Sequence, residues 1–177
     1  PIKSGETAYL FLQHFIKKLK SGGRAGIIIK DTFLSNLDAK LLRKELLETC
    51  NLHTILNLPR KVFTAGVKTI VLFFEKGVST KKIFYYDLNL NRNLGLTNPL
   101  TKSDLTDFEN LYSNKKDSLN SWFKNISDIN KETWDLKVNN PNQIEKIDTR
   151  TPKEIVDEIE EIELKTKKSL NKIKNLL

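Results

Sequence analysis

The side chains that could do chemistry in this 177-residue chain are mostly cationic, and one group of them surrounds an aromatic ring. Arg60, Lys61 and Lys68 flank Phe63 in the segment 59–68, which connects two expected strands. Lysine and arginine side chains bind phosphate groups, so the segment is a candidate site for a polyanion. Residues 1–90 contain 15 Lys and Arg against 7 Asp and Glu, so the chain's net charge of +8 lies entirely in this half. Such a concentrated field suits DNA, although a solvated lysine-rich surface would give the same balance.

Nucleophilic and metal-binding side chains are few. Cys50 is the one cysteine, which excludes an internal disulfide and fits a reducing cytosol, and a buried position is favoured over a nucleophilic role. His14 and His53 complete no set with metal-ligand spacing. The apolar runs are too short to span a membrane and no signal peptide opens the chain, so we expect a cytoplasmic protein without a membrane partner. A start at Pro1 in a chain without methionine favours a piece of a longer product, although removal of an initiator methionine would look the same.

The elements that must position the basic segment alternate between helix and strand. Apolar periodicity predicts helices over residues 5–20 and 38–49, and strands over residues 24–30, 52–57, 69–75 and 82–88. This alternation indicates an α/β fold with a partly parallel sheet. So few strands would leave an apolar edge, which indicates that further strands from an N-terminal part belong beside them.

The second half of the chain is more polar. Residues 91–150 contain one expected helix, from about 103 to 112, and we expect Trp122 and Trp134 to hold irregular structure on the core. At 151–154 the sequence TPKE has the pattern of a capping box and predicts a helix to residue 177. The apolar residues of that helix follow a heptad pattern, interrupted by Thr166 and Ser169: Ile155, Ile159, Ile162, Ile173 and Leu176. Such a stripe either lies on its own domain or, as we favour, pairs with another chain.

Several blocks of the sequence, taken in order, resemble the C-terminal part of the modification (M) subunit of type I restriction-modification systems, an adenine-N6 DNA methyltransferase. The most specific block is VFTAGVKT (62–69) followed by VLFFEKG (71–77). Further blocks are residues 6–13, 19–28, 42–47, 52–59, 134–136 and 140–142.

The resemblance implies the C-terminal portion of a doubly wound, Rossmann-like methyltransferase sheet, of which this chain supplies the last three strands, followed by a helical tail. It divides the chain into residues 1–90 of the α/β domain, a polar extension over 91–150 and a docking helix over 151–177. The glycine loop that binds S-adenosylmethionine and the Asn-Pro-Pro-Phe motif of this family do not occur here, since Asn98-Pro99 and Asn140-Pro141 lack the second proline and the aromatic residue. We therefore assign no catalytic residue and expect this chain alone to bind no S-adenosylmethionine, the cofactor of the full-length subunit.

The resemblance also implies a role for the basic segment. An enzyme that methylates a base within a duplex must flip the base out, and in related adenine methyltransferases an aromatic residue of this loop stacks on it. Phe63 is that candidate, with Arg60, Lys61 and Lys68 on phosphates and Gly66 supplying flexibility or a positive φ. Alternatively, Phe63 fills the core beneath the loop. The implied partners are DNA, the specificity subunit, the restriction subunit and the N-terminal part of the same subunit. A non-catalytic module that binds DNA and the specificity subunit is the alternative function.

Overall fold

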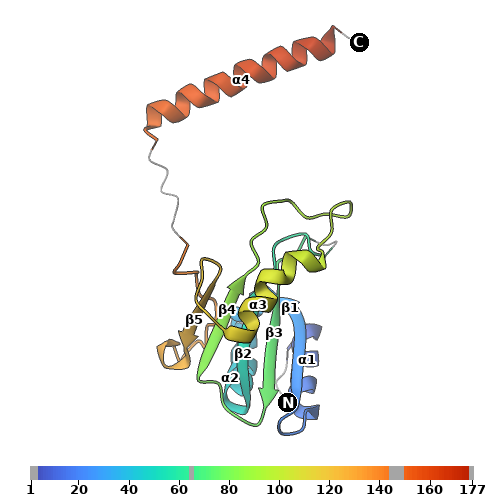
Figure 1. The fold of residues 1–177 in the computed structure, drawn as a ribbon, viewed down its shortest axis with the longest axis vertical. Coiled ribbons are helices and arrows are strands. Elements are labelled where there is room, and N and C mark those ends of the chain that lie inside the picture. Colours follow the sequence, from blue (N-terminus) through green and yellow to red (C-terminus); the bar gives the residue numbers. More distant parts are fainter. Residues whose placement is uncertain (1–3, 64–65, 144–149, 176–177) are drawn as a thin grey trace. The chain divides into compact units, whose positions relative to one another are not determined.

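A mixed five-stranded sheet forms the centre of the first of two compact units, Pro1–Gln143, in the computed structural model (Figure 1). The structure describes residues 4–63, 66–143 and 150–175. The strand order is β1-β3-β2-β4-β5. The strand bounds are β1 Arg24–Lys30, β2 Cys50–Asn57, β3 Thr69–Lys76, β4 Lys82–Asp87 and β5 Ser121–Asn125.

The strand directions confirm an α/β fold with a partly parallel sheet. β3 is antiparallel to both of its neighbours, β1 and β2, so β1 and β2 run in the same direction. β4 is parallel to β2, and β5 is antiparallel to β4. The carboxyl ends of β1, β2 and β4 therefore lie at one end of the sheet, where open α/β sheets bind their ligands.

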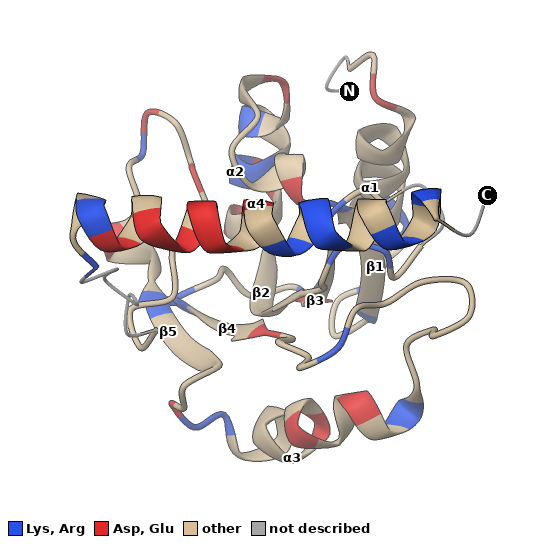
Figure 2. Ribbon diagram, turned by 90° about the horizontal axis from the view of Figure 1, so that it is seen from above, with Lys and Arg blue, Asp and Glu red and all other residues tan. Residues whose placement is uncertain are grey.

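Helices cover both faces of the sheet (Figure 2). α1 (Thr7–Lys18) and α2 (Lys40–Thr49) lie on one face, and α3 (Thr106–Asn114) lies on the other. Successive strand residues point to opposite faces, so Ile55 of β2 joins the core beneath α1 and α2 whereas Leu56 joins the core beneath α3. All six elements that the sequence predicts for residues 1–90 are present.

Residues 115–143 form more regular structure than the sequence predicts. Trp122 lies in strand β5, not in irregular structure, and its ring stacks on Tyr85 of β4 at a centroid distance of 5.3 Å. Trp134 does hold irregular structure on the core: it is buried, and its carbonyl oxygen accepts a hydrogen bond from Arg43 Nε at 2.6 Å. Both tryptophans therefore belong to the first compact unit.

The second unit, Ile144–Leu177, contains α4 (Pro152–Lys174). Its predicted capping box is present, because Thr151 Oγ1 accepts a hydrogen bond from Glu154 N and Glu154 Oε2 accepts one from Thr151 N. Acidic residues fill the first half of the helix and lysines the second (Figure 2). The four described heptad residues, Ile155, Ile159, Ile162 and Ile173, are between 36% and 59% exposed. The fifth, Leu176, lies outside the described residues.

Candidate nucleic-acid interface

The basic loop, residues 59–68, connects the carboxyl end of β2 to the start of β3. Its two ends are tied down by backbone hydrogen bonds, from Leu58 N to Thr69 O at 3.0 Å and from Asp31 N to Lys68 O at 3.1 Å. The loop therefore starts and ends at fixed positions at the carboxyl end of the parallel strands, where the next strand of the same direction, β4, also ends.

Among the described residues of the basic loop, Lys61 at φ 66° and Gly66 at φ 62° have left-handed backbone conformations. The expected positive φ at Gly66 is thus confirmed, and Gly66 N donates a hydrogen bond to Phe63 O at 3.2 Å. A Cβ atom at Gly66 would meet no other atom within 4 Å, so glycine is favoured there by backbone conformation and not by lack of space.

Val62, and not Phe63, fills the core beneath the basic loop. Val62 packs against the buried cluster that includes Leu56 and Phe84. The Phe63 side chain remains 42% exposed, which is unusual for a large aromatic residue beside an available apolar core. Its ring is therefore accessible to a ligand, as base stacking requires.

The three cations of the loop differ in exposure. Arg60 and Lys61 are exposed and Lys68 is half-buried. None of them takes part in the ion pairs that the described residues form. Their charges are thus not neutralised by neighbouring carboxylates within the described part of the chain, and an incoming phosphate would not have to displace an ion-pair partner.

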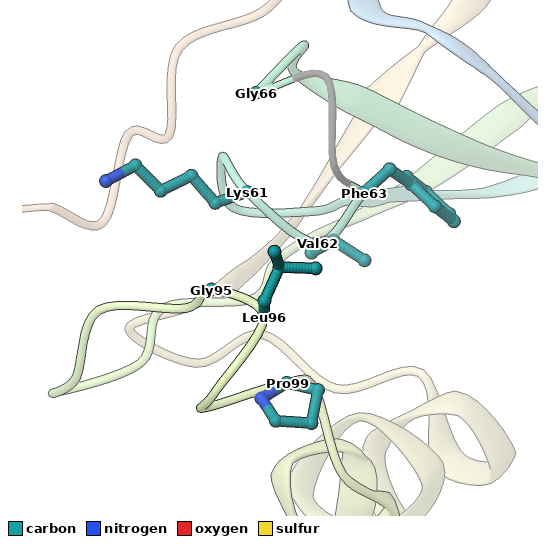
Figure 3. Close-up of a pocket in the computed structure, with 7 residues that line it drawn as sticks. All are labelled: Lys61, Val62, Phe63, Gly66, Gly95, Leu96 and Pro99. Carbon is teal, nitrogen blue, oxygen red and sulfur yellow. The ribbon is translucent and has the colours of Figure 1, made fainter.

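A hollow of about 510 Å³ opens between the basic loop and a second loop that follows β4 (Figure 3). We call it the Phe63 hollow, and its lining residues are Lys61, Val62, Phe63, Gly66, Gly95, Leu96 and Pro99. The structure thus brings three of the five predicted loop residues to one cavity, whereas Arg60 and Lys68 lie outside its lining. Phe63 also borders an apolar hollow of about 380 Å³ that includes Phe73 and Phe108, between the sheet and α3.

The second loop carries no motif in the sequence that marks it as part of the site. The two loops meet because β2 and β4 are parallel neighbours, and their ends are joined by a hydrogen bond from Asn57 Nδ2 to Asp87 Oδ1 at 2.7 Å. A backbone hydrogen bond from Leu88 N to Asn57 O at 2.9 Å continues this connection. The strand pairing that creates the contact is a long-range property, which residues 95–99 alone do not encode.

Two other reactive side chains, Cys50 and His53, are in environments that disfavour catalysis. Cys50 is fully buried, and burial raises the pKa of its thiol, which disfavours the nucleophilic thiolate. His53 lies beneath α3, where burial, assisted by the Lys115 charge, lowers its pKa to about 4. In the described residues no group of His, Cys, Asp and Glu side chains could hold a metal ion. The same part of the chain contains no helix long and apolar enough to cross a membrane.

Known proteins match the chain over most of its length. A family model described as N-6 DNA Methylase matches residues 1–150. The type I restriction enzyme EcoEI methylase subunit of Escherichia coli is 32% identical over 189 residues, which cover 99% of this chain and 38% of that protein. The EcoKI methylase subunit of Escherichia coli strain K12 is 40% identical over 114 residues, which cover 58% of this chain and 22% of that protein.

Solved structures agree with these matches. A modification subunit of a type I restriction enzyme from Vibrio vulnificus YJ016 has a TM-score of 0.75 at 29% identity, covering 83% of this chain and 34% of that one. A chain from a type I restriction-modification system has a TM-score of 0.74 at 31% identity, covering 100% of this chain and 40% of that one. The chain thus spans less than half the length of the proteins it matches, and the resemblance to modification subunits is confirmed. It belongs to the N-6 DNA methylase family, and the relatives it matches are methylase subunits of type I restriction enzymes.

Proposed function

We propose that the chain forms the DNA-contacting part of a type I modification subunit, in which the full-length subunit transfers a methyl group from S-adenosylmethionine to adenine N6 of DNA. The observation that carries this proposal is the half-exposed Phe63 ring in a loop whose cations have no carboxylate partner among the described residues, at the carboxyl end of parallel strands. A flipped base needs a flat apolar surface, and the phosphates on either side of it need positive charge.

In this proposal Phe63 stacks on the extruded adenine. Lys61, which lines the same hollow, holds a phosphate near that base, and Arg60 and Lys68 contact phosphates outside the hollow. The left-handed backbone at Gly66 lets the loop turn back toward β3 after it has presented the ring.

The cofactor site is assigned to the rest of the full-length subunit. S-adenosylmethionine carries ribose hydroxyls and an ammonium group, for which carboxylates are the usual partners. The described residues that line the Phe63 hollow include no Asp or Glu, so this hollow does not fit the cofactor. No step of the methyl transfer is therefore assigned to residues of this chain.

We further propose that other chain segments cover the exposed apolar surfaces of both units. β1 is an edge strand, and Ile28 of β1 and Phe11 and Phe15 of α1 are between 42% and 59% exposed, which suits docking of the N-terminal part of the same subunit. The heptad stripe of α4 suits a helix of the specificity subunit, and the restriction subunit completes the assembly. The proposed action on DNA and the free thiol of Cys50 both support a cytoplasmic location for the protein.

The base-stacking role of Phe63 is tested with two short duplexes, one fully paired and one in which a single adenine faces an abasic site. Unpaired adenine leaves the stack at low cost, so the wild-type chain should bind the second duplex more tightly. Stacking of one base on an aromatic side chain contributes about 1–3 kcal/mol, so Phe63→Ala should weaken binding to this duplex by about 5- to 150-fold. Phe63→Tyr should retain the preference.

Phe15→Ala is the matched control, because Phe15 on α1 is also 42% exposed but lies outside the loop. Its affinity for both duplexes should equal that of the wild-type chain. Equal affinity of the wild-type chain for the two duplexes, or no binding of either, would refute the proposed function. If binding survives but Phe63→Ala leaves the preference intact, the chain is the alternative, a binding module without a base pocket.

A further inference from the structure

Leu96 is the most exposed large apolar side chain that the structure describes, at 84% exposure, and it lies at the Phe63 hollow. It projects from a tight turn in the loop after β4. Gly95 and Asn98 close this turn with two backbone hydrogen bonds of 3.1 Å, one in each direction. Figure 3 shows the Leu96 side chain rising from the turn toward Val62 of the basic loop.

The turn that carries Leu96 is braced by an arginine. The Arg92 guanidinium donates hydrogen bonds to the Asn98 side chain, to Pro99 O at 3.0 Å and to Asp104 Oδ2 at 2.5 Å. The Asp104 carboxylate also accepts a hydrogen bond from Thr101 N at 2.8 Å. The Arg92 and Thr101 hydrogen bonds lower the pKa of Asp104 to about 2, so the ion pair persists at neutral pH.

The Leu96 side chain is thus exposed to water, and no neighbouring side chain that the structure describes buries it. The braced turn fixes the Leu96 backbone at the Phe63 hollow, while the side chain stays 84% exposed. DNA-binding proteins that distort the duplex insert such apolar wedges, leucine among them, between neighbouring base pairs. Lys61 lines the same hollow, and its positive charge favours the duplex as the occupant.

We propose that Leu96 enters the base stack of the bound duplex and fills the space that the base accepted by Phe63 leaves behind. This inference rests on the proposed function, because it needs DNA at the basic loop. It adds a second contact residue, from a different loop, whose role is to stabilise the distorted duplex and not to hold the extruded base.

The experiment compares Leu96→Ala with the wild-type chain on the paired duplex and on the duplex with an adenine opposite an abasic site. The wedge makes its contact only where the stack is open. Leu96→Ala should therefore weaken binding to the abasic duplex by about tenfold, the effect of losing one buried leucine contact, and should change binding to the paired duplex less than about twofold. Leu96→Phe should keep the preference, since phenylalanine is also found as a wedge.

Leu37→Ala is the matched control, because Leu37 is 73% exposed, belongs to the 3-10 helix Leu37–Ala39 before α2 and is not among the residues that line the hollow. It should change neither affinity. Equal losses of Leu96→Ala on both duplexes would overturn the wedge, since Leu96 would then only support the loop. If Phe63→Ala abolishes the preference and Leu96→Ala does not, the wedge is wrong and the proposed function stands. If the wild-type chain shows no preference for the abasic duplex, both the Leu96 wedge and the proposed function are wrong.

Discussion

Arg43 provides the sharpest test of how the polar second half of the chain is fixed to the sheet. Its guanidinium is fully buried and donates to four backbone carbonyl oxygens. Two of them, on Thr133 and Trp134, belong to the segment after β5, and two, on Phe33 and Asn36, belong to the segment between β1 and α2. One side chain thus joins two segments that are about one hundred residues apart in the sequence.

Replacement by methionine keeps the apolar part of the side chain and removes every donor. A buried carbonyl left without a donor costs about 1–3 kcal/mol. Burial lowers the pKa of Arg43, opposed by the Asp135 charge, and this desolvation cost disappears with the guanidinium. The net loss is therefore smaller than the sum of the costs for the four unpaired carbonyls. We expect Arg43→Met to lower the free energy of unfolding by about 3–5 kcal/mol.

Urea unfolding followed by circular dichroism measures this loss, and tryptophan fluorescence reports whether the segment around Trp134 detaches at lower urea than the sheet unfolds. Arg24→Met is the control, since Arg24 is exposed on β1, and it should change the free energy of unfolding by less than about 0.5 kcal/mol. A loss below about 1 kcal/mol for Arg43→Met, with one unchanged transition, would show that water or neighbouring groups satisfy the carbonyls and that the clamp is unimportant.

Three further predictions address pH, docking and the cofactor. Burial lowers the pKa of His53 from 6.5 to about 4, so between these pH values the unfolded chain binds a proton at His53 and the folded chain does not. The free energy of unfolding should therefore fall by about 2 kcal/mol between pH 7 and pH 4. His53→Asn should make the free energy of unfolding depend less on pH. Changing Ile159 and Ile162 together to Asp should abolish co-purification with the specificity subunit and leave the melting temperature of the α/β unit unchanged; a lowered melting temperature would assign α4 to the domain's own core. Calorimetry should detect no binding of S-adenosylmethionine to this chain, and micromolar binding would contradict the assignment of the cofactor site to the rest of the subunit.

Local patterns predict most of the sheet. The runs of β-branched or aromatic residues in β1, β3 and β4, and the alternation at the start of β2, are visible because each strand carries its own apolar signal. β5 is missed because its five residues contain two apolar side chains, Trp122 and Phe123, which are adjacent in the sequence and do not alternate with polar residues. That strand forms because Trp122 stacks on Tyr85 and because β4 offers an unpaired edge, and neither property is contained in the segment itself.

The basic loop and the buried Arg43 show the same difference between local and long-range signals. The basic loop is predicted from sequence because Phe63, its cations and Gly66 lie within one short contiguous segment. The buried Arg43 is missed because a single arginine in an amphipathic helix looks like a solvated charge. Only the surrounding carbonyls, three of them in loops, show that it is structural.

The placement of Phe63 and Leu96 on different loops has a physical reason. β2 and β4 run parallel and are hydrogen-bonded neighbours, so the segments that leave them emerge side by side although thirty residues separate Asn57 from Asp87. In the proposed complex, Phe63 contacts the extruded base and Leu96 fills the space that this base leaves, so the two side chains have to reach different places. Parallel neighbouring strands supply two separate loops at a fixed spacing, and the Asn57–Asp87 hydrogen bond holds that spacing where both loops begin. A change at Asn57 should therefore alter the base preference through the geometry of both loops, without removing either contact residue.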